Sequence, residues 1–331
     1  MNLQNIRWAL VGCGEHGIRS HVVPAEKIEW VDLVAVCDPN LSARTLVETT
    51  VGRSLQHLSE EGVYASADID AVVIGSPDRF HLASLERAVM AGMHVLCEKP
   101  LATEVNDLER LTAILEMAEE KGLVVTSCHP RRFDYPYRGM RNELRRLTEM
   151  VGNILSLQLD FSYHAPSKEG LHKGLLIDHI NHELDTANYL LGYSPTWMKR
   201  IVDSQTHYQA FGARKDGIAL FFEGTRKLNG KTYPEFIRIR FERGHIELDC
   251  KRGRATLCHH DDTDGLEPYS RGQRVPKTNY ESRFLNVMQN FADSIRGVTE
   301  NYLTHQDLRD NSAVGVHLTQ SGHWDPEGLL S

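Results

Sequence analysis

The feature that most restricts the fold is a glycine-rich turn near the N-terminus, between a short apolar strand and a helix. The apolar run 6–11 leads directly into Gly12-Cys13-Gly14-Glu15-His16-Gly17, which has the pattern G-x-G-x-x-G. In such a unit the first glycine permits the tight turn, and the second lets the backbone approach a pyrophosphate. The third lets the helix pack against the sheet. Because the pattern also occurs in turns without a ligand, its context has to support it.

Four further apolar runs follow at regular intervals, with helical patterns between them. The runs are 33–37, 70–74, 94–97 and 123–127, and the clearest helical patterns cover 82–91 and 106–121. Strands that are apolar on both faces and separated by helices are typical of a parallel sheet covered on both sides. Right-handed crossovers then give a doubly wound α/β domain of the Rossmann type, which we place at residues 1–128.

An acidic residue in the expected place supports a dinucleotide site. Asp38 ends the second apolar run, 21 residues after Gly17. A carboxylate there accepts hydrogen bonds from the adenosine ribose hydroxyls and repels a 2′-phosphate. The two elements together predict a nicotinamide cofactor, with NAD favoured over NADP. The alternative is an ordinary turn aspartate before Pro39.

The second half of the chain has a different pattern. A helical segment from about 178 to 191 ends at Gly192, and alternating strands are expected at 154–163, 218–222, 236–241 and 245–248. Runs of strands joined by turns favour an α+β domain with an open, mainly antiparallel sheet. We assign it to residues 129–331, with the boundary near 128–137.

Composition excludes some classes of partner. The formal net charge of −8 disfavours a nucleic-acid role, which needs a basic surface. No apolar run is long enough to cross a bilayer, and no signal peptide is recognisable at the N-terminus. The six cysteines are scattered without a C-x-x-C pair, which indicates reduced core residues in a cytoplasmic protein.

Four further segments occur in the order that one family uses. They are G-S-P-D-R-F-H at 75–81, E-K-P at 98–100, R-R-F-D at 131–134 and G-L-L-I-D-H-I-N-H-E-L-D at 174–185. Together with the glycine turn they resemble the glucose-fructose oxidoreductase / inositol dehydrogenase / MocA family. The resemblance extends from Trp8 to about Gly192.

The resemblance implies an NAD-dependent oxidoreductase acting on CH–OH groups of a sugar, polyol or related small molecule. It places nicotinamide between the domains, near three catalytic residues, Lys99, Asp178 and His182. It also implies a homodimer or homotetramer formed through the C-terminal sheet. Arg131, Tyr163 and His164 are candidate substrate contacts. The glycine motif and the resemblance together place cofactor contacts at Gly12, Gly14, Glu15, His16, Gly17, Asp38, Ser76, Pro77, His81, Glu98 and Lys99.

The chemistry of these side chains supports the catalytic roles independently. Oxidation of an alcohol needs a group that takes the hydroxyl proton, and burial beside a cationic cofactor lowers the pKa of a lysine. Asp178 and His182 are four residues apart, so on a helix they share one face. Histidine can hold the hydroxyl or pass the proton at physiological pH, while the aspartate orients it.

Other functions are compatible with the same residues. An ordinary helix-surface pair is the alternative for Asp178 and His182, and a metal site is the alternative for His179, His182 and Asp185. We favour no metal, since the segment is not H-E-x-x-H. At the level of the whole protein, the alternatives are an NAD-assisted glycosidase of the same fold and a non-catalytic dinucleotide sensor.

Overall fold

The structure is a computed structural model that describes residues 5–163, 175–192, 194–227, 235–259 and 269–329. The chain forms two compact units. The N-terminal unit comprises residues 1–133 and 280–312, and the C-terminal unit comprises 134–279 and 313–331.

The N-terminal unit contains a six-stranded sheet in the order β3-β2-β1-β4-β5-β6, and every neighbouring pair is parallel. This order is that of a doubly wound dinucleotide-binding domain, so the predicted fold is confirmed. The strand interiors are apolar on both faces; β4, for example, is buried along its whole length. The strands are β1 (Ile6–Val11), β2 (Val31–Cys37), β3 (Gln56–His57), β4 (Ala71–Ile74), β5 (His94–Cys97) and β6 (Val125–Ser127).

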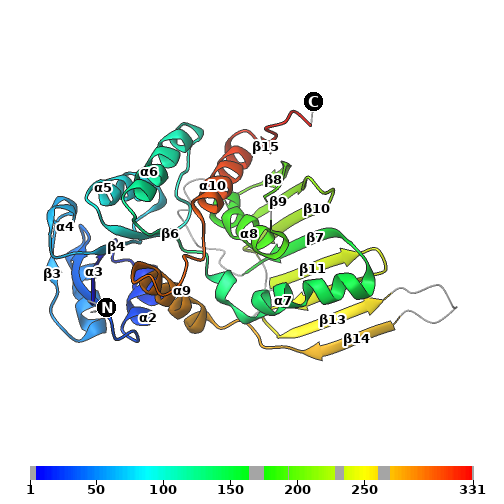
Figure 1. Cartoon of the computed structure of the whole chain (residues 1–331), viewed down its shortest axis with the longest axis horizontal. Helices are drawn as coiled ribbons and strands as arrows, with labels where there is room; N and C mark the ends of the chain where they lie inside the picture. Colours follow the sequence, from blue (N-terminus) through cyan, green and yellow to red (C-terminus); the bar gives the residue numbers. More distant parts are fainter. Residues whose placement is uncertain (1–4, 164–174, 193, 228–234, 260–268, 330–331) are drawn as a thin grey trace. The chain divides into compact units, whose positions relative to one another are not determined.

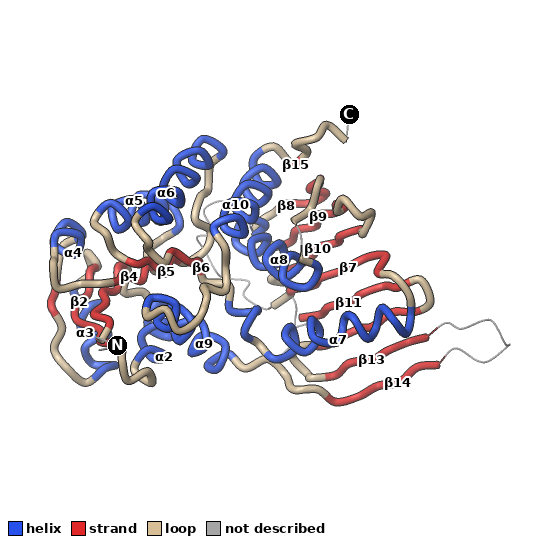
Figure 2. The backbone as a smooth tube through the Cα atoms, viewed as in Figure 1, coloured by secondary structure: helices blue, strands red, loops and turns tan. Residues whose placement is uncertain are grey.

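Helices cover both faces of this sheet. Figure 1 shows α5 and α6 on one side of the sheet, with α2, α3 and α9 on the other, and Figure 2 shows the same layers by element type. The helical elements of the unit in chain order are α1 (Glu15–Gly17), the π-helix η1 (Ile18–Val22), α2 (Val23–Ala25), α3 (Leu41–Val51), α4 (Glu60–Ala65), η2 (Asp78–Phe80), α5 (His81–Met90), η3 (Val105–Asp107), α6 (Leu108–Glu120), η4 (Pro130–Phe133) and α9 (Tyr280–Ile295).

The N-terminal unit also takes in a distant part of the chain, which differs from a single division after residue 128. Helix α9 buries Phe284, Val287, Met288 and Phe291 in the same core as β1 and β2. The division from the C-terminal unit falls inside α10 (His305–Gln320). Burial of this apolar stripe returns the chain to the first domain, and sequence periodicity alone does not reveal which sheet a late helix will cover.

The C-terminal unit contains a nine-stranded sheet in the order β14-β13-β12-β11-β7-β10-β9-β8-β15. Only β7 and β10 pair in parallel, so the expected open, mainly antiparallel sheet is confirmed. Its strands are β7 (Ile154–Phe161), β8 (Trp197–Asp203), β9 (His207–Ala213), β10 (Ala219–Thr225), β11 (Glu235–Phe241), β12 (Gly244–Asp249), β13 (Arg254–His259), β14 (Tyr269–Arg274) and β15 (His323–Trp324).

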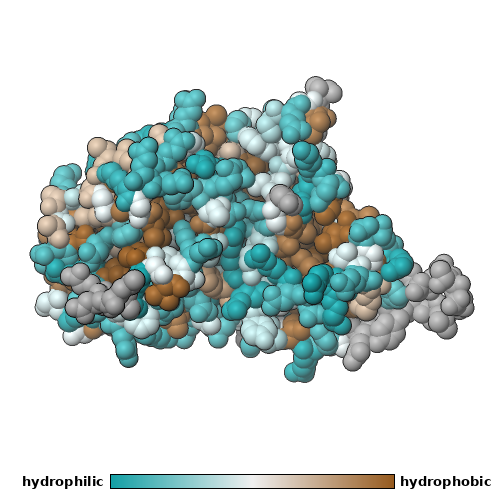
Figure 3. All heavy atoms as spheres, viewed as in Figure 1, coloured by the Kyte–Doolittle hydropathy of each residue, from teal (hydrophilic) through white to brown (hydrophobic). Residues whose placement is uncertain are grey.

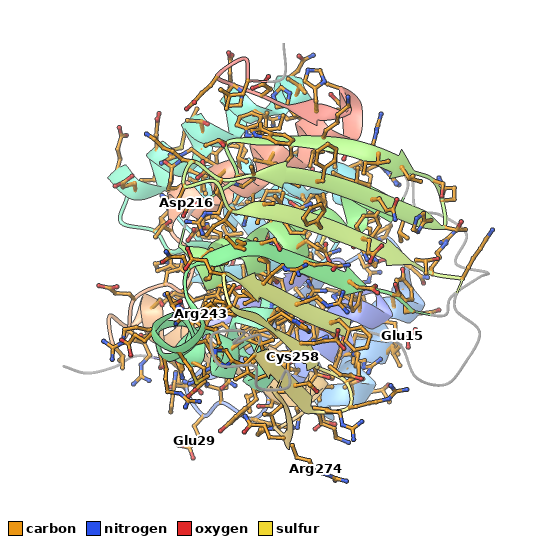
Figure 4. All side chains as sticks on the ribbon, turned by 90° about the vertical axis from the view of Figure 1, so that its right-hand side faces the viewer. Glu15, Glu29, Asp216, Arg243, Cys258 and Arg274 are labelled. Carbon is orange, nitrogen blue, oxygen red and sulfur yellow. The ribbon has the colours of Figure 1, made fainter. Side chains whose placement is uncertain are left out.

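One face of this sheet carries the core of the unit. Helix α7 (Tyr135–Val151) packs on β12, and α8 (Leu175–Leu191) packs on β7, β9 and β10. Their buried residues join those of the strands in one cluster. In Figure 4 the strands of the sheet lie nearest the viewer, and Cys258 is labelled on β13. The strands therefore present a second face to solvent within this unit.

The surface is mainly polar on the face seen in Figure 3. Most side chains on the face seen in Figure 3 are hydrophilic, with smaller hydrophobic patches between them. Among the described residues, no helix combines the length and the apolar character that a membrane span needs.

Candidate active site

The three glycines of the glycine turn have different surroundings. A Cβ added to Gly12, whose φ is +92°, would lie 2.4 Å from the backbone nitrogen of Ser76, so this turn requires glycine. A Cβ on Gly17 would lie 3.1 Å from the carbonyl oxygen of Gly12. At Gly14, by contrast, a Cβ would meet nothing within 4 Å. The three glycines thus match the turn, approach and packing roles expected of a dinucleotide loop.

Asp38 lies against this loop at the end of β2. Its Oδ2 accepts a hydrogen bond from the backbone nitrogen of Cys13 at 2.9 Å, and its Oδ1 accepts one from Asn40 N at 2.8 Å. Both contacts hold the carboxylate beside the glycine turn while it remains half-exposed. An acceptor in this place fits the ribose hydroxyls of an adenosine.

The remaining cofactor candidates lie at the carboxyl ends of the neighbouring strands. Ser76 and Pro77 follow β4, and His81 begins α5. The imidazole of His81 contacts the carbonyl oxygen of Ser76 at 2.7 Å and that of Pro100 at 2.8 Å. The structure therefore brings together the turns after β1, β2, β4 and β5 at one edge of the sheet, where open α/β sheets bind their ligands.

Glu98 is the central charge of this edge. Its side chain is buried, and its Oε1 accepts hydrogen bonds from His16 Nε2 at 3.0 Å and His21 Nε2 at 2.8 Å. Burial acts to raise the pKa of Glu98, but the charge of His16 and the hydrogen bonds from His16 and His21 outweigh it. The pKa of Glu98 is therefore held well below its usual range.

Lys99 follows Glu98 at the end of the buried strand β5. The residue is half-buried, and its peptide bond to Pro100 is cis. The neighbours on either side, Glu98 and Pro100, are both buried. Lys99 is thus a partly accessible residue between two buried ones. The catalytic role of Lys99 stays a prediction.

Arg131 belongs to η4, beyond β6 and close to the point where the units divide. It is 6% exposed. Its neighbour Arg132 instead contacts Tyr302 O at 2.9 Å and Asp307 at 3.6 Å. Substrate contact by Arg131 stays a prediction.

Asp178 and His182 lie on α8 in the C-terminal unit, four residues apart in an unbroken helix. Most of α8 is buried, whereas these two side chains are half-buried. The Oδ2 atom of Asp178 lies 3.6 Å from His179 Nε2. The helix therefore presents a carboxylate and an imidazole on one partly accessible face, as expected; their contact with substrate stays a prediction.

Tyr163 lies next to this part of α8. Its ring stacks on His179 with centroids 5.2 Å apart, and its hydroxyl lies 3.4 Å from His179 Nε2. Burial, followed by the charge of Asp178, raises the pKa of Tyr163 to about 12. The phenol is therefore a neutral donor at physiological pH. His164, the other candidate on this segment, lies outside the described residues.

A metal site at His179, His182 and Asp185 is the alternative for α8. Within the described parts of the chain, the one group of possible ligands lies instead in the N-terminal unit, at His21, Glu98 and Cys128. Burial and then the charge of Glu98 raise the pKa of the Cys128 thiol well above its usual value. Because a metal binds the thiolate, this environment favours hydrogen bonding over metal binding.

Sequence reasoning missed His21. It lies on the π-helix η1, four residues after Gly17, and is fully buried against Glu98. A π-helix widens the turn by one residue and often occurs at functional sites. The only signal was a histidine close behind the glycine motif, and its partner is 77 residues away.

Comparison with known proteins supports the assignment of the N-terminal unit. A family model described as "Oxidoreductase family, NAD-binding Rossmann fold" matches residues 6–129. The chain is 32% identical over 189 residues to the inositol 2-dehydrogenase/D-chiro-inositol 3-dehydrogenase of Shouchella clausii (strain KSM-K16), covering 56% of this chain and 53% of that protein. It is 25% identical over 222 residues to the rhizopine catabolism protein MocA of Rhizobium meliloti, covering 66% and 67%. The match spans about half the length of the first of these relatives.

Solved structures share the fold over nearly the whole chain. An oxidoreductase from Agrobacterium radiobacter in complex with NAD+, L-tartaric acid and magnesium has a TM-score of 0.81 at 16% identity, covering 97% of this chain and 98% of that chain. A levoglucosan dehydrogenase in complex with NADH and levoglucosan has a TM-score of 0.81 at 18% identity, covering 98% and 100%. At these identities the likeness establishes the two-domain fold.

The glycine turn, the acidic residue after β2 and the E-K-P turn thus occur in a domain that matches an NAD-binding family model, and its curated relatives include inositol dehydrogenases and MocA. Residues 6–129 therefore form an NAD-binding Rossmann domain of the glucose-fructose oxidoreductase / inositol dehydrogenase / MocA oxidoreductase type.

Proposed function

We propose that this protein is an NAD-dependent oxidoreductase that transfers a hydride between nicotinamide and a hydroxyl or carbonyl group of a sugar, polyol or related small molecule. The observation that carries the proposal is the convergence of the glycine turn, Asp38 and the Glu98–Lys99 turn at one edge of the Rossmann sheet. Relatives described as inositol dehydrogenases support the substrate class.

Bound NAD supplies the hydride acceptor for oxidation and, when reduced, the hydride donor. The residues of this chain have the other tasks. Lys99, in the turn after β5, takes the hydroxyl proton of the substrate. His182 holds or relays that proton, and Asp178 orients a hydroxyl on the same face of α8. Arg131 and Tyr163 are further substrate contacts in this proposal.

The cofactor in this proposal is NAD in preference to NADP. The carboxylate of Asp38 lies against the loop that receives the pyrophosphate, at 2.9 Å from Cys13 N. A 2′-phosphate on the adenosine would approach this anion in a partly buried setting, where repulsion between like charges is only weakly screened.

A second part of the proposal concerns assembly. Ile201 on β8 and Phe221 on β10 are 61% and 46% exposed, and both line one hollow on the open face of the C-terminal sheet, beside Phe211 and Arg238. Exposed apolar side chains gathered on a sheet face are typical of an interface. We infer a homodimer or homotetramer formed through this face.

Light scattering tests this assembly. Phe221→Glu should lower the molecular mass of the protein in solution, and Leu46→Glu on the exposed side of α3 should not.

We also infer a cytoplasmic location. The described part of the chain contains no disulfide bond, and four of the six cysteines are buried. Reduced thiols in such positions fit a reducing compartment. Detection of the protein in an oxidising compartment would contradict this location.

The decisive experiment is a screen of inositols, sugars and sugar acids with NAD⁺, monitored by the absorbance of NADH. Stoichiometric reduction of added NAD⁺ by one substrate class is expected. Redox-neutral cleavage of a glycoside, with the cofactor retained, would indicate instead a glycosidase of the same fold. Tight NADH binding with no turnover across the panel would indicate a sensor.

A further inference from the structure

The turn that carries Lys99 is held from both sides by histidines of the N-terminal unit. On one side, Glu98 accepts hydrogen bonds from His16 and His21. On the other side, the carbonyl oxygen of Pro100 contacts the ring of His81. Lys99 thus lies between two residues that are each hydrogen-bonded to histidines.

His81 contacts two carbonyl oxygens at once. Its Nδ1 lies 2.8 Å from Pro100 O, and its Nε2 lies 2.7 Å from Ser76 O. A carbonyl oxygen only accepts, so each ring nitrogen has to donate. A neutral imidazole carries one N–H and would turn a lone pair toward the other carbonyl. Only the doubly protonated imidazolium satisfies both contacts.

Two features of the position of His81 disfavour a positively charged ring. The side chain is buried, with 2% of the residue exposed. It also begins α5, and the positive end of the helix dipole disfavours a cation there. Two short charge-assisted hydrogen bonds offset these costs. They join the turn after β4 to the turn after β5, which are separate segments of chain.

On the other side of Lys99, Glu98 is held by histidines that donate hydrogen bonds to its carboxylate. Its carboxylate is buried, and one oxygen receives both imidazoles at ordinary hydrogen-bond lengths. His16 belongs to the glycine turn itself, and Ser20 connects His16 to Tyr280 through contacts of 3.3 and 2.7 Å. The glycine turn, η1 and α9 therefore all restrain the residue before Lys99.

We propose that His81, as an imidazolium linking Ser76 O to Pro100 O, is a positioning residue that sets the Lys99 amino group in place for proton transfer. This inference rests on the proposed function of Lys99. Small displacements of a reacting group have large effects on rate: a shift of about 1 Å can cost on the order of a hundredfold. His81 therefore acts on the rate through the geometry of its neighbour, without touching the substrate.

His94 provides a matched control within the same sheet. It begins β5, at the end of the strand opposite to Lys99, and its Nδ1 accepts a hydrogen bond from Val124 N at 2.9 Å. A ring nitrogen that accepts cannot carry a proton, and burial lowers the pKa of His94. The two histidines thus differ in charge state as well as in their distance from the E-K-P turn.

The first test reads the charge state and needs no substrate. In the full-length protein labelled with ¹⁵N-histidine, nitrogen NMR at neutral pH should show a ring with hydrogen on both nitrogens, and this signal should disappear in His81→Gln. A His81 ring with a single N–H in the wild-type protein would overturn the proposal. Because the measurement uses the wild type, poor folding of the variant leaves the proposal testable.

The second test reads the position of Lys99 through turnover. His81→Gln should lower kcat by roughly ten- to a hundredfold, a larger factor than its effect on the Kd for NADH, and His94→Gln should leave both unchanged. A loss confined to NADH affinity, or a normal kcat, would contradict the positioning role. If Lys99→Ala itself retains wild-type turnover, the proposed function fails, whereas the imidazolium observed by NMR would stand.

Discussion

The two units carry candidate functional groups of different kinds. In the N-terminal unit the contacts expected with the cofactor depend largely on backbone, because Gly14 leaves open space and Gly12 packs against Ser76. In the C-terminal unit the candidate groups are side chains on one helix, Asp178 and His182 of α8. A backbone site is altered by adding a Cβ, whereas a side-chain site is altered by removing one functional group.

The reason for this difference is the sheet that supports each site. Parallel strands end at a common edge, so the turns after β1, β2, β4 and β5 meet there automatically. In the antiparallel sheet successive strands end at opposite edges, and the site groups come from the helix that covers one face. The comparison predicts that mutations in the first unit change cofactor affinity and those in the second change turnover, with Lys99 and its positioning residue His81 as exceptions.

The largest effect is expected from Lys99→Ala and His182→Ala. Loss of a proton-transferring group should lower kcat by about 10²- to 10⁴-fold. The Kd for NADH, measured by fluorescence titration, should remain near that of the wild type for His182→Ala. Near-normal turnover in both variants would end their assignment as catalytic residues.

Gly12→Ala should abolish measurable NADH binding, with a loss of at least about a hundredfold. The new Cβ would lie 2.4 Å from Ser76 N, and the φ of +92° disfavours any side chain. Gly52→Ala is the matched control, since Gly52 has a φ of +72° and no neighbour within 4 Å of the new Cβ. It should lower the free energy of unfolding by about 1 kcal/mol and leave NADH affinity unchanged.

Asp38→Ala should weaken NAD⁺ binding by roughly tenfold, the value of one charge-assisted hydrogen bond. The same change should reduce the preference for NAD⁺ over NADP⁺, because the carboxylate that repels the 2′-phosphate is gone. Asp32→Ala, on the same strand β2 but at its other end, should change neither affinity. Equal affinity of the wild type for both cofactors would refute the selectivity.

Tyr163→Phe should have the smallest effect, a few-fold decrease in kcat/KM from the loss of one neutral hydrogen bond. Because the pKa of Tyr163 is raised to about 12, the phenol keeps its proton across the working range. The pH profiles of variant and wild type should therefore run parallel between about pH 6 and 10. A basic limb that disappears in the variant would contradict this charge state, and Tyr189→Phe on α8 serves as a control.

Much of the first unit was predictable from sequence because its signals are local. The strands 6–11 and 94–97 were expected at the residues where β1 and β5 lie, and the glycine motif indicated the turn between them. β3 was missed because it has only two residues, both of them exposed. The return of α9 to the first core was missed because amphipathic periodicity reports a buried stripe without its partner.

The sequence alone therefore determined the features formed by residues close together in the chain. These are the glycine turn, the acidic residue after β2, and a carboxylate and an imidazole one helical turn apart. Tertiary folding alone decided that His21 would reach Glu98, that His81 would face two carbonyl oxygens, and that α9 would complete the first core. The physical reason is that backbone geometry and hydrophobic period act over a few residues. Hydrogen bonds between buried groups depend instead on how distant segments pack.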